Sequence, residues 1–179
     1  MKSPFWYWES ALSPALCDLA LLEMAELQSQ QGAVGLGQGE TNTQIRNSRI
    51  CWAKQNHWLE AVLYNHAIYA NEQCGWVKVV GRPEQVQLTR YDKEGHYDWH
   101  QDWGPLEDND TVRKLSVVAL LNDESEFEGG AFEMKLTEIP KLKRGSILVF
   151  PSWAEHRVAP VTDGQRVSAV CWVRGPQTF

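Results

Sequence analysis

The chain has 179 residues, 43% hydrophobic and 22% charged, a composition typical of one globular domain with a sizeable core. Its 17 basic and 23 acidic side chains give a net charge of −6, which argues against a nucleic-acid partner because such proteins usually carry a basic excess. No apolar run approaches the ~20 residues of a membrane-spanning helix, and polar residues interrupt the N-terminal stretch where a signal peptide needs an apolar core.

The four cysteines stand at positions 17, 51, 74 and 171, and no two of them form a C-x-x-C pair. A disulfide framework is typical of shorter chains with denser cysteines. We therefore expect buried, inert thiols and a cytoplasmic location.

The first predicted element is a helix within residues 13–31. Ser13 can cap it, Pro14 suits its first turn, and apolar side chains recur at helical spacing after them. The next stretch, residues 32–43, holds four glycines and predicts a flexible loop. No Lys-Ser/Thr follows these glycines, so the loop is not a phosphate cradle, although a loop of this length can serve as a lid.

A second helix is expected within residues 56–75, with Asn56 as its cap and Gly75 as its stop. Beyond Gly75 the hydrophobic period changes to two, which is typical of strands. Seven β-rich runs are separated by turn residues: 76–80, 84–91, 96–102, 114–122, 130–136, 146–150 and 166–173. Many short strands indicate a barrel or a double-sheet jelly roll. We therefore expect a mainly β (α+β) fold in one domain over residues 1–179, with helical support in about 13–75 and a β core in about 77–174.

The stretch "HYDWHQD" at 96–102 concentrates imidazole and carboxylate groups. Alternate positions of an extended strand share one face, and four such residues do so here: His96, Asp98, His100 and Asp102. A His-x-Asp pair supplies two corners of a metal site, and His156 can supply the third because it follows a strand and a turn that lead back. Asp98 then remains an ordinary polar strand or turn residue, and His96 a surface or pocket-rim group.

Two histidines and one carboxylate leave coordination positions open, as in non-haem Fe(II) oxygenases, but the same donors also bind hydrolytic zinc. Arg166 and Ser168, which share one face of the strand "RVSAVCWV", separate these readings. An arginine that points into a barrel needs an anionic partner because it keeps its proton, and no acidic residue lies on this strand. A guanidinium with a hydroxyl beside it suits the carboxylate of a small dicarboxylic acid.

The combined motif resembles that of the 2-oxoglutarate and Fe(II)-dependent dioxygenases, most closely their prolyl 4-hydroxylase-like branch. The resemblance covers about residues 77–174. It implies a double-stranded β-helix of the jelly-roll or cupin-like kind with N-terminal helices packed on it. It also implies Fe(II), 2-oxoglutarate as cosubstrate, O₂, and ascorbate as reductant.

By this resemblance the metal ligands are His100, Asp102 and His156. The residues that match the cosubstrate site are Arg166, Ser168 and Tyr91. The chain departs from oxygen-sensing prolyl hydroxylases at Leu120 and Val170, where those relatives carry hydroxyl-bearing residues that Ser168 could replace. Because Asp102 is present, the related halogenases, which lack that carboxylate, are disfavoured.

Arg113 and Trp172 match the residues that contact the peptide beside the target proline in these relatives. The resemblance therefore predicts hydroxylation of a prolyl residue in a peptide or protein. Two alternatives remain: a hydroxylase of a free amino acid or another small molecule, and a non-catalytic barrel that only binds. Two further arginines after the glycine-rich loop, Arg46 and Arg49, are interpreted as ordinary solvated charges.

Overall fold

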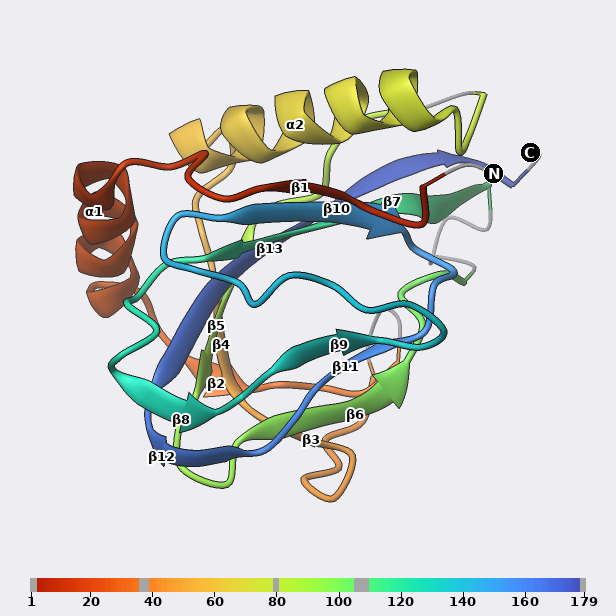
Figure 1. Ribbon diagram of the computed structural model, residues 1–179. Coiled ribbons are helices and arrows are strands. Elements are labelled where there is room, and N and C mark those ends of the chain that lie inside the picture. The colour runs from red at the N-terminus through yellow and green to blue at the C-terminus, as the bar shows by residue number, and fades with distance from the viewer. Residues whose placement is uncertain (1–2, 36–38, 79–80, 105–109, 178–179) are drawn as a thin grey trace.

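The computed structural model describes residues 3–35, 39–78, 81–104 and 110–177. Figure 1 shows α2 (Trp58–Cys74) lying along the outer face of the larger sheet, with α1 (Pro14–Ala25) at one end. A smaller sheet faces the larger one from the opposite side. The mainly β architecture with N-terminal helices packed against it is confirmed.

The larger sheet has seven strands in the order β1-β10-β7-β13-β5-β4-β2. Their bounds, in chain order, are β1 (Trp6–Trp8), β2 (Gln30–Gln31), β4 (Arg49–Trp52), β5 (Gln87–Tyr91), β7 (Thr111–Leu120), β10 (Ile147–Pro151) and β13 (Arg166–Pro176). The smaller sheet runs β3-β6-β11-β9, with β3 (Arg46–Asn47), β6 (His96–His100), β9 (Phe132–Met134) and β11 (His156–Val158). A two-stranded ribbon pairs β8 (Phe127–Gly129) with β12 (Val161–Gly164). All pairings are antiparallel, as in a double-stranded β-helix.

The strand β13 shows how the sheet separates a core from a cavity. One set of alternate side chains packs under the helices in the main core: Val167, Ala169, Cys171 and Val173. The opposite set lines the cavity between the sheets: Arg166, Ser168, Val170 and Trp172. The period-two prediction for this strand is therefore confirmed, because alternate side chains point to opposite faces.

The helix boundaries match the prediction in part. The Ser13 hydroxyl accepts a hydrogen bond from the Leu16 amide at 3.4 Å and caps α1, with Pro14 in the first turn. The helix ends at Ala25 rather than near residue 31, because Gln30 and Gln31 pair with β4.

The cap of α2 was placed one residue too early. His57 holds that position, and its Nδ1 accepts from the Leu59 amide at 3.3 Å, whereas Asn56 has a left-handed φ of 59°. Gly75 ends the helix in the left-handed conformation, as predicted.

The predicted strand over residues 76–80 is wrong for its first three residues, which lie outside any strand, and its last two are outside the described residues. The sequence patterns also missed β1, β2, β3, β4, β8 and β12, each of two to four residues, whereas β11 is the expected return of the chain at His156. Strands this short contain too few alternations to be recognised by their period.

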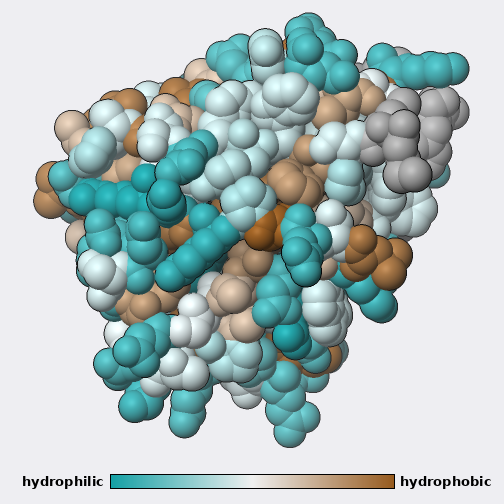
Figure 2. All heavy atoms as spheres, in the orientation of Figure 1, coloured by the Kyte–Doolittle hydropathy of each residue, from teal (hydrophilic) through white to brown (hydrophobic). Residues whose placement is uncertain are grey.

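Figure 2 shows hydrophilic side chains over most of the face in view, with apolar patches toward α1. Three leucines on this helix are at least a third exposed: Leu16, Leu19 and Leu22. All four cysteines are buried, as expected. Within the described residues, neither helix is long and apolar enough to cross a membrane.

Candidate functional site

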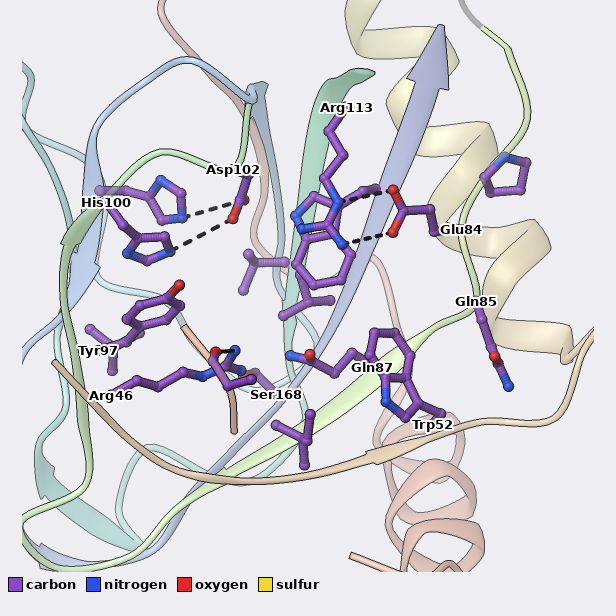
Figure 3. A pocket seen from close by; sticks show the side chains of 18 of the residues that line it. Arg46, Trp52, Glu84, Gln85, Gln87, Tyr97, His100, Asp102, Arg113 and Ser168 are labelled. Atoms are coloured by element: carbon purple, nitrogen blue, oxygen red, sulfur yellow. Dashed lines mark hydrogen bonds and ion pairs between the residues drawn. The ribbon is translucent and has the colours of Figure 1, made fainter. Parts of the chain in front are cut away.

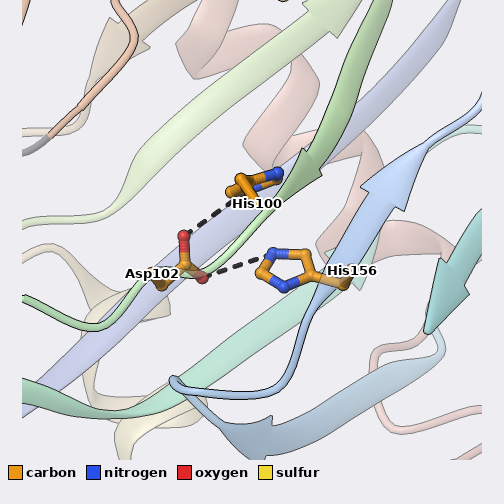
Figure 4. A group of neighbouring side chains, drawn as sticks. All are labelled: His100, Asp102 and His156. Carbon is orange, nitrogen blue, oxygen red and sulfur yellow. Dashed lines mark ion pairs between the residues drawn. The ribbon is translucent and has the colours of Figure 1, made fainter. Parts of the chain in front are cut away.

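Three predicted metal ligands meet at one point between the sheets. His156 at the start of β11 lies directly opposite His100 at the end of β6, and Asp102 follows two residues later. Their ligand atoms all lie within 4.8 Å of one another. Figure 4 shows both imidazoles directed at the carboxylate, with His100 Nε2 at 3.7 Å and His156 Nε2 at 3.5 Å from its two oxygens. This is a cluster of two nitrogen donors and one oxygen donor, suited to a divalent transition metal.

Backbone carbonyls orient both imidazole rings. His100 Nδ1 lies 2.7 Å from the Asp98 carbonyl oxygen, and His156 Nδ1 lies 2.9 Å from that of Ala154. A carbonyl only accepts, so Nδ1 carries the proton and donates it, which leaves the Nε2 lone pair available in each ring. The rings are therefore set to coordinate through Nε2.

Hydrogen bonds from the side away from the histidines fix the Asp102 carboxylate. The Ser116 hydroxyl donates to its Oδ2 at 2.7 Å, and Ser116 Oγ lies 2.9 Å from Ser152 Oγ. The Asp102 amide also donates to the Ser152 carbonyl at 2.9 Å. The side chain is thereby fixed in one orientation towards the two imidazoles.

The charge state of the cluster suits a metal. Burial opposes ionisation of Asp102, but His156, His100 and Arg113 outweigh it and lower its pKa to about 2. Burial, reinforced by the neighbouring His156, lowers the pKa of His100 to about 4. At neutral pH the cluster therefore offers an ionised carboxylate and a neutral His100 imidazole, which are the protonation states that bind metals.

The other two members of the "HYDWHQD" group lie outside this cluster. The ring nitrogens of His96 face the carbonyls of Glu94 and Gln44 at 2.9 and 3.1 Å. Asp98 is exposed and accepts a hydrogen bond from the Trp99 amide. Both positions agree with their interpretation as ordinary polar residues.

The expected cosubstrate residues lie together deeper in the cavity. Arg166 and Tyr91 face each other across β13 and β5, with the Arg166 Cζ 5.7 Å from the Tyr91 ring centre. Arg166 is 2% exposed and donates from Nη1 to the Ser168 hydroxyl at 3.0 Å. Burial lowers the pKa of Arg166, but an arginine stays charged in proteins.

The Arg166 guanidinium is incompletely satisfied. Its Nη2 is buried with no hydrogen-bond partner among the described residues, and Arg166 makes no ion pair with any of them. Leaving a buried charged donor unpaired is costly, so such a group indicates the place of an anionic ligand.

Arg113 and Trp172 form a second assembly, and Figure 3 shows its Arg113 beside Glu84. The Arg113 Cζ stacks 3.7 Å from the Trp172 ring centre. Glu84 accepts from Arg113 Nε at 2.9 Å and from Nη2 at 2.8 Å. Both predicted substrate residues thus line the cavity, and Arg113 is held by an ion pair that the sequence patterns did not reveal.

The interpretation of Arg46 as an ordinary solvated charge is wrong. It is 7% exposed and donates to the Ser48 hydroxyl and the Ala33 carbonyl, each at 2.9 Å. Its guanidinium lies 4.6 Å from the Tyr97 ring centre, and Tyr97 stacks on His100 with centroids 3.5 Å apart (Figure 3). The pairing of β3 with β6 places Arg46 beside Tyr97, and no local sequence pattern predicts that pairing.

Arg49 behaves as expected. It is exposed and donates to the hydroxyl and carbonyl of Ser29.

One cavity of about 1130 Å³ is lined by the three predicted metal ligands, the expected cosubstrate residues and the arginine–tryptophan pair, together with Glu84, Arg46 and Tyr97. Sites for small ligands usually measure about 300–1,000 Å³. The cavity can therefore hold a small dicarboxylate and leave room for part of a larger substrate.

Comparison with known proteins agrees with this geometry. Residues 86–174 match the family model described as "2OG-Fe(II) oxygenase superfamily". A PKHD-type hydroxylase of Synechococcus sp. (strain CC9311) is 30% identical over 173 residues, covering 90% of this chain and 74% of the relative. A PKHD-type hydroxylase of Xylella fastidiosa (strain M12) is 35% identical over 100 residues, and there the match covers 49% of this chain and 43% of the relative.

Solved structures share the fold. A Pseudomonas putida prolyl-4-hydroxylase superimposes with a TM-score of 0.75 at 21% identity, covering 96% of this chain and 93% of that one. A prolyl hydroxylase from Trichoplax adhaerens, in complex with a hypoxia inducible factor oxygen degradation domain peptide fragment, gives a TM-score of 0.72 at 18% identity, with 95% and 83% covered.

Proposed function

Because the chain belongs to the 2OG-Fe(II) oxygenase superfamily and has a prolyl 4-hydroxylase-like fold, we propose that it hydroxylates a prolyl residue in a peptide or protein. The observation that carries this proposal is the content of one cavity. Three groups line it: a two-histidine, one-carboxylate cluster, a stacked arginine–tryptophan pair, and a buried guanidinium whose Nη2 has no hydrogen-bond partner among the described residues.

The residues present fit the family's iron and cosubstrate. His100, Asp102 and His156 would hold Fe(II), which together with 2-oxoglutarate and O₂ supplies the oxidising power. The donor set has the right charge state, and Asp102 is locked by Ser116. Ascorbate is expected to sustain turnover by keeping the iron reduced.

Arg166 would hold the far carboxylate of 2-oxoglutarate. Its unpaired Nη2 and the adjacent Ser168 hydroxyl provide donors that match one carboxylate group. Tyr91, buried and opposite Arg166, forms the wall of this subsite. A buried subsite of this kind also excludes water from the reacting groups.

Trp172 and Arg113 would position the substrate. A proline ring is apolar and flat enough to pack on an indole. The Nη1 of Arg113 is not used by Glu84 and can donate to a peptide carbonyl. The cavity volume and this assembly favour a peptide over a free amino acid, and the complete donor set favours catalysis over binding alone.

The direct test is turnover by metal-ligand variants. His100→Ala, Asp102→Ala and His156→Ala should each abolish Fe(II)-dependent succinate formation while the fold persists, because two ligands hold a weakly bound divalent ion poorly. His96→Ala, on the same strand but outside the cluster, is the matched control. Full activity in any ligand variant would refute the assignment.

The substrate is tested separately. Proline-containing peptides incubated with the protein, Fe(II), 2-oxoglutarate and ascorbate should gain one oxygen on proline by mass spectrometry. Trp172→Ala should impair peptide turnover more than peptide-free decarboxylation of 2-oxoglutarate, whereas Trp99→Ala, outside the cavity, should affect neither. Oxidation of free amino acids without oxidation of peptides would overturn the prolyl-peptide assignment.

A further inference from the structure

The two histidines of the metal cluster pack against different kinds of aromatic ring. His156 contacts two apolar rings, with its ring centre 5.4 Å from that of Phe132 and 4.7 Å from that of Phe150. His100 instead stacks on Tyr97, with ring centres 3.5 Å apart and planes only 12° from parallel. The face of the His100 imidazole is therefore covered by a tyrosine rather than by phenylalanines.

This stacking adds a restraint that the hydrogen bond to His100 lacks. The bond between Nδ1 and the Asp98 carbonyl fixes the tautomer, but a single hydrogen bond still allows the ring to tilt. A metal ion accepts the Nε2 lone pair in the plane of the ring, so tilting would turn that lone pair away from the metal. A parallel ring at 3.5 Å limits the tilt, because the two faces are already in contact.

Tyr97 is in turn held by a cation. Arg46 lies directly opposite Tyr97 in the pairing of β3 with β6, and its Cζ is 4.6 Å from the Tyr97 ring centre. Figure 3 shows Tyr97 between His100 and Arg46. A guanidinium within about 6 Å of a ring centre is attracted to the face of that ring. The three side chains therefore form one stack that ends at the metal cluster.

The protein fixes the outer end of this stack. Arg46 is 7% exposed, and it donates from Nε to the Ser48 hydroxyl and from Nη1 to the Ala33 carbonyl, each at 2.9 Å. The chain also passes close to the guanidinium at Gly32, where a Cβ would lie 2.6 Å from Arg46 Nε and 2.4 Å from Ser48 Oγ. Any larger residue at position 32 would push the guanidinium out of its place.

We propose that Arg46 and Tyr97 are positioning residues of the metal centre. The guanidinium holds the phenol ring, and the phenol ring holds the His100 imidazole in the plane that coordination requires. This inference deepens the proposed function and rests on its metal cluster. Both residues act through His100, and groups that orient a metal-bound histidine typically contribute about 10- to 100-fold to metal affinity.

The test is Co²⁺ binding to the full chain, followed by titration and by the visible absorption of the bound ion, which reports ligand geometry. Tyr97→Leu keeps an apolar side chain but removes the ring, so it should weaken Co²⁺ binding about tenfold and shift the absorption bands. Tyr97→Phe keeps the ring and should bind Co²⁺ as the parent protein does.

Changes at the outer end of the stack test the role of the cation. Arg46→Gln should weaken Co²⁺ binding severalfold, and Arg46→Lys should restore part of the loss because it keeps the charge. Gly32→Ala should act like Arg46→Gln, since its methyl group displaces the guanidinium. Arg157→Gln is the matched control. It removes a guanidinium that lies 4.9 Å from the Trp99 ring centre in the same sheet, outside the metal cluster, and should leave Co²⁺ binding unchanged.

Several outcomes would overturn the proposal. One is unchanged Co²⁺ affinity and absorption in Tyr97→Leu, and another is an equal loss in Tyr97→Phe, which would assign the effect to the hydroxyl group. If Tyr97→Leu does not fold, parent-like Co²⁺ binding in both Arg46→Gln and Gly32→Ala would overturn it. A change in Arg46→Gln confined to the 2-oxoglutarate requirement would show that Arg46 binds the cosubstrate instead.

Failure of this inference can be told from failure of the proposed function. A parent protein that binds no Co²⁺ would refute the metal cluster itself and both proposals with it. Parent-like binding in all the stack variants would refute the positioning role alone. The expected losses of Co²⁺ affinity, together with peptides that gain no oxygen, would refute prolyl hydroxylation and leave the positioning role standing.

Discussion

Two arginines on neighbouring strands line the same cavity, and they differ in how the protein satisfies them. Arg166 on β13 is almost fully buried, and the one side-chain hydrogen bond that it makes to a described residue is to the neutral Ser168 hydroxyl. Arg113 on β7 has a carboxylate across two of its nitrogens and an indole under its face. A buried arginine without an internal counter-charge is suited to bind an anionic ligand. A buried arginine that is already paired with a carboxylate instead forms part of the cavity surface.

The largest expected effect is on the affinity for 2-oxoglutarate, which should depend on Arg166 far more than on Arg113. Arg166→Ala should raise the concentration of 2-oxoglutarate needed for half-maximal succinate formation by roughly 10- to 150-fold, since a hydrogen bond to a charged group is worth about 1.5–3 kcal/mol. Arg166→Lys should lie between, because it keeps the charge but loses the planar fork. Arg113→Ala should change this requirement by about twofold at most. A larger change in Arg113→Ala than in Arg166→Ala would remove the distinction.

The second effect is on the free energy of unfolding, and here the change at Arg113 should be larger than the change at Arg166. Glu84→Ala should lower the free energy of unfolding by about 2 kcal/mol, because it leaves the mostly buried Arg113 unpaired. Arg166→Met should change it by less than about 1 kcal/mol in the metal-free protein, since no ion pair with a described residue is broken. Urea unfolding of both variants measures the difference. A greater loss in Arg166→Met would show that Arg166 is a structural residue.

The smallest effect is on the pH dependence of stability, and it arises from His100 rather than from either arginine. Folding lowers the pKa of His100 from 6.5 to about 4 because the ring is buried and lies near His156. Between these values the unfolded chain binds more protons, so stability falls as pH is lowered through this window. From pH 7 to pH 5.5 the metal-free protein should lose about 1 kcal/mol from this residue.

The control for this pH effect is His100→Gln. That variant should show a flatter dependence of urea unfolding on pH over the same interval. An identical slope in the variant and the parent protein would contradict the assignment to His100.

The sequence patterns revealed the residues whose positions follow from spacing. Period two along β13 correctly placed Arg166 and Trp172 on one face. The patterns could not reveal Glu84 or Arg46, because their partners come from strands far away in the chain. They also placed a cap at Asn56, since an asparagine is a common cap and a histidine is a rarer one.

The alternating pattern of "HYDWHQD" placed four side chains on one face, and only the family motif singled out His100 and Asp102, the two that the structure gathers. What separates them is the pairing of β6 with β11 opposite His100, together with β3 beside His96. Register between strands depends on contacts across the whole sheet, so no local pattern contains it.

The carbonyls of Asp98 and Ala154 have a consequence for metal choice in the cell. Each lies two residues before its histidine and fixes the ring by a hydrogen bond within the protein. The donors therefore keep their geometry without iron, and an imidazole–carboxylate set of this kind binds Co²⁺, Ni²⁺ and Cu²⁺ with greater intrinsic affinity than Fe²⁺. On the proposed function, iron occupancy would depend on which ions the cell makes available, and a rise in competing metals would stop turnover without unfolding the protein.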